Sequence, residues 1–272
     1  MKQVLSGTQT TKWTAAVSAL HDALSTYPDD LRWGMTLFPD TTGESCAQDA
    51  IPFPLADQQA PSIDTLMQSA LDTANALYPA KGPCVTNIDT GIEQAAADPS
   101  LAMTDRKSYV MLVTDGGQSG CSLGGGGSGA VSAVSDLATN HGVTTFVVGF
   151  GSSVNATELD NLAAAGGAPQ TGAHKYFEAD DAAALDTTIA AIASQAVSCQ
   201  ISVNPAPPDA SQLYVWFDHT TSVPRDPTDT LGWDYDPATQ TVTLYGSYCD
   251  QLKSHTVSAI NIIFGCPTPP IL

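Results

Sequence analysis

The sequence predicts an α/β fold with a doubly wound, mostly parallel sheet, followed by a small all-β module. Up to about residue 198, apolar runs that suit buried strands alternate with amphipathic helical stripes. From Cys199 onward the helical periodicity is lost, and prolines and turn clusters separate short strand-like stretches. We therefore predict two domains, residues 1–198 and residues 199–272.

The elements of the first domain follow from the spacing of its apolar residues. Trp13 to Leu24 and Ile63 to Leu77 each place apolar residues on one helical face. Two prolines within residues 51–55 favour an edge strand, whereas the unbroken apolar run Tyr109–Val113 suits a strand buried on both faces. The predicted order is helix 13–24, strands 33–38 and 51–55, helices 63–77 and 86–95, strand 109–113, helix 131–139, strand 143–149, helix 157–165, strand 175–177 and helix 185–196.

The second domain shows strand patterns and turn signals. We predict strands at residues 201–203, 213–217, 241–245 and 257–264. A module of about 70 residues has a marginal core of its own, so disulfide bonds would help to stabilise it.

The charge balance excludes several classes of partner. The chain has 9 Lys+Arg against 28 Asp+Glu, a net charge of −19. Nucleic acids and anionic membranes bind through basic patches, and the sequence contains none. It also lacks an apolar run of the roughly 20 residues that span a bilayer. We therefore expect neither a nucleic-acid partner nor a membrane span.

Six cysteines indicate the compartment. They are widely spaced, without a CxxC pair or a zinc-finger spacing, which favours disulfides over metal binding. The possible disulfide cysteines are Cys46, Cys84, Cys121, Cys199, Cys249 and Cys266. Cys199 could pair with Cys249 or with Cys266, and the pattern leaves the connectivity open. Disulfides predict an extracellular, periplasmic or cell-surface protein, although residues 1–8 carry no export signal.

Two residues are candidates for chemistry. Asp115 directly follows the buried strand 109–113 and Thr114, and ligands of open α/β sheets bind beyond the carboxyl ends of the strands. Its carboxylate could bind a metal ion, or it could cap the following turn. Thr86 lies at the start of a helix, where its hydroxyl could coordinate a hard cation such as Mg²⁺ or serve as the N-cap.

These residues carry a resemblance to a family. The order of elements, the phrase YVMLVTDG at residues 109–116 and the phrase TNIDTGIEQA at residues 86–95 resemble a von Willebrand factor type A domain, with its Rossmann-like sheet. That family builds a metal-ion-dependent adhesion site from an Asp-x-Ser-x-Ser motif, a threonine and an aspartate. The resemblance assigns Thr86 and Asp115 to the second and third segments. It implies Mg²⁺, or Mn²⁺ or Ca²⁺, as the cofactor.

The first segment of that site is absent from the sequence. Met1 is followed by a short polar stretch and then by a helix that starts near Lys12. We expect the first strand and the serine motif to lie upstream of Met1, the sequence being truncated at its N-terminus or its start codon misassigned. Two ligands hold Mg²⁺ poorly because the ion requires near-octahedral oxygens. Metal binding by this chain is therefore expected to be weak or absent.

The resemblance implies a binding or adhesion protein outside the cytoplasm. In the family, the metal ion accepts an acidic side chain from a protein partner. The alternative is a structural cell-envelope interaction protein whose metal site is vestigial. We do not expect an enzyme, since the sequence shows no nucleophile paired with a base and no pair of catalytic carboxylates.

Overall fold

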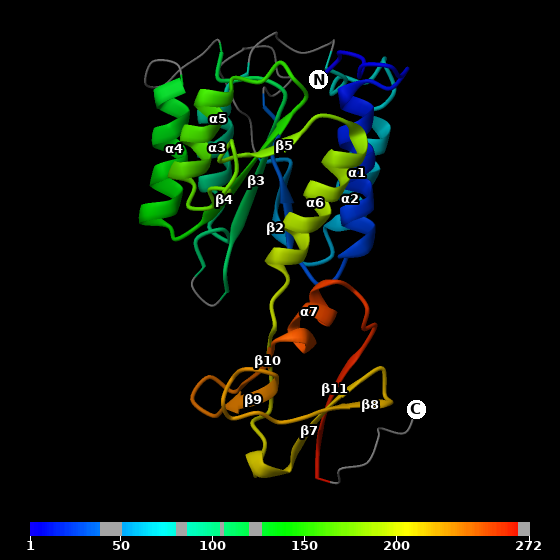
Figure 1. Ribbon diagram of the computed structural model, residues 1–272, viewed down its shortest axis with the longest axis vertical. Helices are drawn as coiled ribbons and strands as arrows, with labels where there is room; N and C mark the ends of the chain where they lie inside the picture. The colour runs from blue at the N-terminus through cyan, green and yellow to red at the C-terminus, as the bar shows by residue number, and fades with distance from the viewer. Residues whose placement is uncertain (39–50, 80–85, 104–105, 120–126, 266–272) are drawn as a thin grey trace. The chain divides into compact units, whose positions relative to one another are not determined.

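The computed structural model divides the chain into two compact units, Met1–Ala196 and Val197–Leu272, which Figure 1 shows as a ribbon. The structure divides the chain after Ala196, two residues before the boundary that we propose after residue 198. The structure describes residues 1–38, 51–79, 86–103, 106–119 and 127–265.

The first unit is an α/β structure, as predicted. Its described strands form a parallel sheet in the order β3-β4-β5 and an antiparallel pair, β1-β2. Among the helices that the structure describes, none combines the length and apolar character needed to cross a membrane. The elements are α1 (Lys12–Thr26), β1 (Trp33–Met35), β2 (Phe53–Ala56), α2 (Ala60–Ser69), α3 (Ile88–Ala96), β3 (Tyr109–Thr114), α4 (Gly127–Asn140), β4 (Thr144–Phe150), α5 (Ala156–Ala165), β5 (Phe177–Ala179) and α6 (Ala182–Ala196).

Strand β4 is the centre of the parallel sheet. It pairs with β3 from Thr144 to Gly149 and with β5 from Val148 to Phe150. Val147 packs into the apolar cluster formed with α3, α4 and α5, whereas Phe146 alternates to the other face, and both are buried. Helices α3, α4 and α5 lie on one side of the strands and α1 and α6 on the other (Figure 1). Both faces are thus covered, as a parallel sheet requires.

A second apolar cluster holds α1 and α2 together. Trp13 and Val17 of α1 pack against Ile63 and Met67 of α2, with the strands β1 and β2 alongside. The Trp13 indole Nε1 donates a hydrogen bond to the Ala70 carbonyl at 2.9 Å, so the buried ring has its polar group satisfied. The amino-terminal helix is therefore anchored through its apolar face.

Helix α2 is shorter than the pattern predicts. The apolar stripe extends to Leu77, but the helix ends at Ser69, so its predicted second half is wrong. The Asn75 amide donates to the Ser69 carbonyl at 3.1 Å, and the Asp72 carboxylate accepts from the Ala74 N–H at 2.8 Å. These local side-chain bonds compete with the helical pattern and turn the chain.

The described residues of the second unit form two three-stranded antiparallel sheets, β6-β10-β9 and β11-β7-β8. Alternating residues of the facing sheets, such as Val215, Trp233 and Val242, form its core. A small β module is thus confirmed, although the sequence pattern missed β8, β9 and the helix α7. The elements are β6 (Gln200–Ser202), a 3₁₀ turn (Ala210–Gln212), β7 (Leu213–Phe217), β8 (Thr221–Val223), β9 (Gly232–Asp236), β10 (Thr241–Tyr245), α7 (Ser247–Lys253) and β11 (Ile260–Phe264).

An acidic turn between β8 and β9 is satisfied by its own residues. The Asp226 carboxylate accepts hydrogen bonds from the hydroxyls of Thr228 and Thr230 and from the Leu231 N–H. These bonds, that from Thr228 foremost, hold the pKa of Asp226 well below its usual range. The carboxylate therefore shapes the turn.

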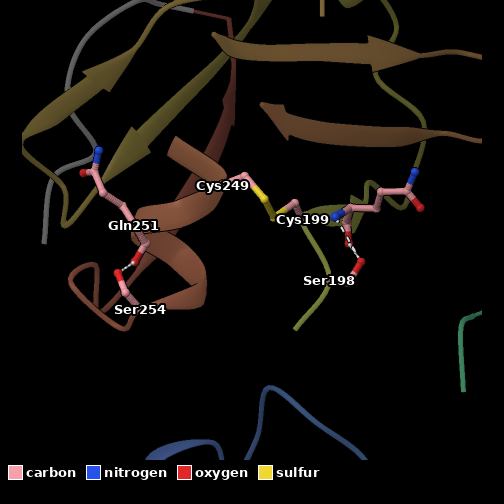
Figure 2. Close-up of a disulfide and its surroundings, with 6 residues drawn as sticks. Ser198, Cys199, Cys249, Gln251 and Ser254 are labelled. Atoms are coloured by element: carbon pink, nitrogen blue, oxygen red, sulfur yellow. Dashed lines mark hydrogen bonds between the residues drawn. A yellow bond between two sulfur atoms is a disulfide. The ribbon is translucent and has the colours of Figure 1, made fainter. Parts of the chain in front are cut away.

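A disulfide joins Cys199 to Cys249 (Figure 2), so the structure pairs Cys199 with one of its two candidate partners. Cys199 immediately precedes β6, and its carbonyl accepts from the Leu244 N–H of β10 at 2.9 Å. Cys249 lies in α7, so the bond ties this helix to the sheet. The predictions for Cys46, Cys84, Cys121 and Cys266 fall outside the described residues and stay predictions.

Removing this disulfide should destabilise the second unit. The bond closes a loop with a sequence separation of 50, for which the loss of loop-closure entropy corresponds to about 4 kcal/mol. We expect the double variant Cys199→Ala/Cys249→Ala to lose about that much free energy of unfolding, measured by urea denaturation. Ser254→Ala, in the same region and exposed, is the control and should change stability by less than about 0.5 kcal/mol. Equal denaturation midpoints for the double variant and the wild type would contradict the role of the bond.

The contact between α1 and α2 should be sensitive to pH. His21 Nδ1 lies 2.8 Å from Asp64 Oδ1, and this hydrogen bond, followed by the charge of Asp64, raises the pKa of His21. The protonated imidazole is thus favoured in the folded state. Its contribution is fully present below the unfolded pKa of about 6.5 and is lost as the pH rises through the raised folded pKa.

We therefore expect the free energy of unfolding to fall more steeply with rising pH, above about pH 6.5, in the wild type than in His21→Gln. Denaturation series at several pH values measure the difference, with Asp64→Asn as a parallel variant. The idea fails if the wild type and His21→Gln show the same pH dependence.

Candidate functional site

The carboxyl ends of β3 and β4 meet at one edge of the parallel sheet, because their register pairs Thr114 with Gly149. The loop after β3 begins at Asp115, and the loop after β4 begins at Gly151. This is the edge at which open α/β sheets bind ligands. Side chains from α1, α3 and α5 also contact these loops, which makes it the candidate site.

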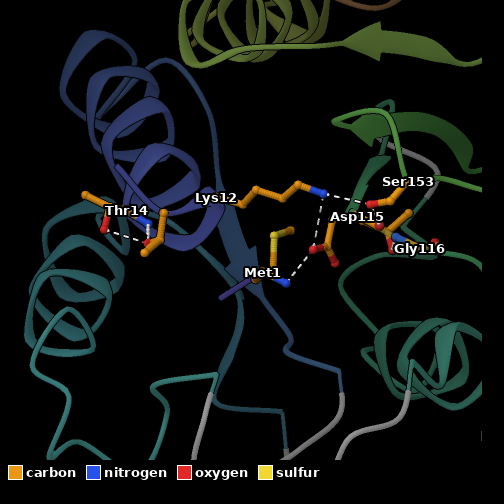
Figure 3. A network of polar contacts seen from close by, with 8 residues as sticks. Met1, Lys12, Thr14, Asp115, Gly116 and Ser153 are labelled. Carbon is orange, nitrogen blue, oxygen red and sulfur yellow. Dashed lines mark hydrogen bonds and ion pairs between the residues drawn. The ribbon is translucent and has the colours of Figure 1, made fainter. Parts of the chain in front are cut away.

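Asp115, the predicted metal ligand, is paired with cations of the chain itself. Its Oδ2 lies 2.5 Å from the Met1 amino nitrogen and 3.6 Å from the Lys12 Nζ (Figure 3). It does not cap the turn: the Thr114 hydroxyl accepts from the Gly116 N–H at 3.2 Å and donates to the Gly116 carbonyl at 2.8 Å. The Asp115 carboxylate therefore faces the Lys12 ammonium at the start of α1.

Thr86, the second predicted ligand, lies in the neighbouring loop. Its N–H donates to the Ser119 carbonyl at 3.1 Å, and its own carbonyl accepts from the Ser119 N–H at 2.8 Å. The N-cap residue of α3 is Asn87, so Thr86 does not play that part. The structure thus brings the loops of Thr86 and Asp115 to the same edge, since Ser119 belongs to the loop that Asp115 begins.

Gln118, which the sequence pattern did not single out, fixes the loop after β3. Its Nε2 donates to Asp89 Oδ1 at 2.7 Å, and its Oε1 accepts from the Asp89 N–H at 3.2 Å. Its backbone N–H donates to Glu158 Oε1 at 2.6 Å. Asp89 and Glu158 stand in the first turns of α3 and α5, where carboxylates are favoured by the helix dipole. The loop is therefore held between two helix N-termini.

Gly117, next to Gln118, leaves room for the Glu158 carboxylate. A Cβ added at Gly117 would lie within van der Waals overlap of the Glu158 carboxylate, at 2.3 Å from Oε2. Of the pair Gly116-Gly117, Gly117 has this contact, whereas a Cβ at Gly116 would meet no atom within 4 Å. The glycine is visible in the sequence, but its contact with Glu158 is seen only in the structure.

Lys12 is the other site residue that the pattern missed. It is the first residue of α1 and only 4% exposed. Its Nζ donates to the Ser153 Oγ at 3.0 Å, in the loop after β4 (Figure 3). A lysine at the start of a helix, in a chain with 9 basic residues, was the available signal.

The described residues of this edge do not fit a divalent cation. Within the described parts of the chain, no three His, Cys, Asp or Glu residues gather as a metal site. Asp115 Oδ2 already faces two ammonium groups within 4 Å, at Met1 and Lys12. A metal ion bound to this oxygen would be repelled by the buried Lys12 ammonium. The role of Thr86 and Asp115 as metal ligands stays a proposal.

The candidate site lies on a parallel α/β sheet, and the sequence places this sheet in a known family. The family model of the von Willebrand factor type A domain matches residues 5–191, more than half of the chain. The chain belongs to this family. No curated protein matches it significantly.

Solved structures with a similar fold share little sequence with the chain. Proximal thread matrix protein 1 from the mussel byssus has 18% identity and a TM-score of 0.48, covering 70% of this chain and 44% of its own. A second structure of that protein has a metal-ion-dependent adhesion site (MIDAS) motif occupied by zinc. The von Willebrand factor type A protein of Catenulispora acidiphila has 13% identity and a TM-score of 0.43, covering 76% of this chain and 42% of its own.

The pilus adhesin SpaC of Lactobacillus rhamnosus GG, in its open conformation, has 11% identity and a TM-score of 0.47. It covers 86% of this chain and 35% of its own. The chain thus spans less than half the length of each of these structures.

Loss of the Gln118 side chain should loosen the site. We expect Gln118→Leu to lower the free energy of unfolding by about 1–3 kcal/mol, because buried polar groups of Asp89 lose hydrogen bonds. Thermal or urea denaturation measures the change. Gln68→Leu, at an exposed position of α2, is the matched control and should cost less than about 0.5 kcal/mol. Equal losses of stability in the two variants would show that the Gln118 hydrogen bonds do not stabilise the site.

Proposed function

We propose that the protein is a binding or adhesion protein that works outside the cytoplasm and holds a protein partner at the carboxyl edge of its parallel sheet. The observation that carries the proposal is the membership of residues 5–191 in the von Willebrand factor type A family, joined to the clamped loops at that edge. Residues 115–119 after β3 and the loop after β4 are contacted by side chains from three helices. Such pre-ordered loops bind a partner with little loss of conformational entropy.

An extracytoplasmic location is supported by the covalent chemistry. The Cys199–Cys249 bond requires an oxidising compartment to form and persist. The net charge of −19 keeps such a chain away from anionic lipid surfaces and nucleic acids. We accordingly place the protein in the extracellular space, in the periplasm or at the cell surface.

The partner contact is proposed as protein–protein binding and not as catalysis. In the metal-dependent sites of the family, the partner supplies an acidic side chain to the ion. In this chain we propose Thr86 and Asp115 as two of the ligands of such a site. Because Asp115 is paired with Lys12 at 3.6 Å, a second candidate also has support: a structural cell-envelope interaction protein with a vestigial metal site.

An adhesion assay tests the location of the contact. Beads carrying the full chain are exposed to purified extracellular-matrix and cell-surface proteins, and retention under flow is measured. We expect retention on at least one partner to fall by at least about tenfold in Ser119→Arg, because a bulky cation then occupies an exposed position of the loop after β3.

Thr139→Arg is the matched control. It adds the same side chain at an exposed position near the end of α4, which leads to the amino end of β4, opposite the candidate site. Its retention should equal that of the wild type. Retention that is unaffected by Ser119→Arg but lost on changes in Val197–Leu272 would favour the structural alternative, and no retention by any partner would contradict both candidates.

A further inference from the structure

Lys12 stands where an ammonium group is costly. Its side chain is 6% exposed, and burial removes the hydration of the charge. It is also the first residue of α1, where the helix dipole disfavours a cation, and the first turn contains no acidic residue to offset it. An ammonium in this place requires compensating contacts, which lie in the loops at the carboxyl edge of the sheet.

The contacts of the ammonium join three segments of the first unit. Lys12 Nζ donates to Ser153 Oγ at 3.0 Å after β4 and lies 3.6 Å from Asp115 Oδ2 after β3. The Ser153 hydroxyl in turn donates to the Asp115 carbonyl at 3.5 Å. The cation thus connects the start of α1 to both loops, as Figure 3 shows.

The backbone is shaped to admit this side chain. Gly151 has φ +83°, a conformation that favours glycine. A Cβ at this position would lie 2.7 Å from Lys12 Cε and 2.9 Å from Nζ. The chain therefore keeps the space beside Ser153 for the lysine.

We propose that the Lys12 ammonium is the resident cation of this edge, taking the place of a divalent metal ion. It pairs with Asp115 at 3.6 Å, beside the Met1 amine, and connects Asp115 and Ser153 to α1. A metal ion on Asp115 would lie about 2.1 Å from the carboxylate oxygen and so close to a confined ammonium, and the two cations exclude each other. Folding of the unit is accordingly independent of divalent ions. We also expect partner binding to be independent of divalent ions, and this expectation rests on the proposed function.

The experiment measures Mn²⁺ binding by the electron paramagnetic resonance signal of the free ion. The full chain carries an N-terminal tag, which turns the Met1 amine into an amide and leaves Lys12 as the ammonium facing Asp115. We expect the Lys12-containing chain to bind Mn²⁺ no more tightly than the millimolar range, with a melting temperature unchanged by EDTA. Lys12→Met should bind Mn²⁺ at least about tenfold more tightly, because the competing charge is gone.

Two further variants make the result specific. Lys107→Met removes a lysine from an exposed position and should bind Mn²⁺ as weakly as the parent. Lys12→Met/Asp115→Asn should lose the gain seen in Lys12→Met, because the carboxylate that would hold the ion is absent. Micromolar Mn²⁺ binding by the parent chain would overturn the proposal without any variant, even where Lys12→Met does not fold. Equal affinity of Lys12→Met and its parent would overturn it as well.

The adhesion assay with and without EDTA separates this inference from the proposed function. Retention that EDTA does not change supports the resident lysine. Retention that EDTA abolishes overturns the lysine proposal and leaves the adhesion function standing. Where no partner is retained, the adhesion function fails, and the Mn²⁺ titration decides the role of Lys12 by itself.

Discussion

The parallel pairing of β3 with β4 is the constraint on which the rest of the first unit depends. A parallel sheet buries both faces, so helices must cover it on each side and connect its strands by crossovers. The pairing also brings the ends of the two strands to one edge, with Thr114 opposite Gly149. The loops that begin at Asp115 and Gly151 are therefore neighbours before any side chain acts on them.

Side chains then convert this neighbourhood into a fixed surface. Gln118 connects the loop after β3 to the first turns of α3 and α5, and Lys12 connects the same loop and the loop after β4 to α1. Charges of both signs occur within the site: carboxylates lie at the amino ends of α3 and α5, and a cation lies at the amino end of α1. Helix α1 begins with Lys12, a cation that the helix dipole disfavours, and this lysine faces Asp115.

Sequence patterns predicted the α/β class, the strands β3 and β4 and the small β module, because buried strands and amphipathic helices leave periodic apolar signatures. They failed where local polar bonds decide the structure. Hydrogen bonds of Asp72 and Asn75 turn the chain after Ser69, so α2 ends before its apolar stripe does. The short helix around Cys249 has no apolar periodicity that would predict it. Thr86 and Asp115 were found from their places beside strand and helix ends, whereas Lys12, Gln118 and Ser153 act through tertiary contacts that spacing along the chain does not encode.

The glycine at the start of the loop after β4 links two distant parts of the sequence. Gly151 leaves the room that the Lys12 side chain fills, so a side chain at residue 151 would displace the ammonium and strain the backbone at once. A lysine at residue 12 therefore requires a glycine at residue 151, whereas the glycine does not require the lysine, because a φ of +83° favours glycine in either case. Among related chains, a lysine at the start of the first helix should occur with a glycine here, and the glycine should persist where the lysine is replaced.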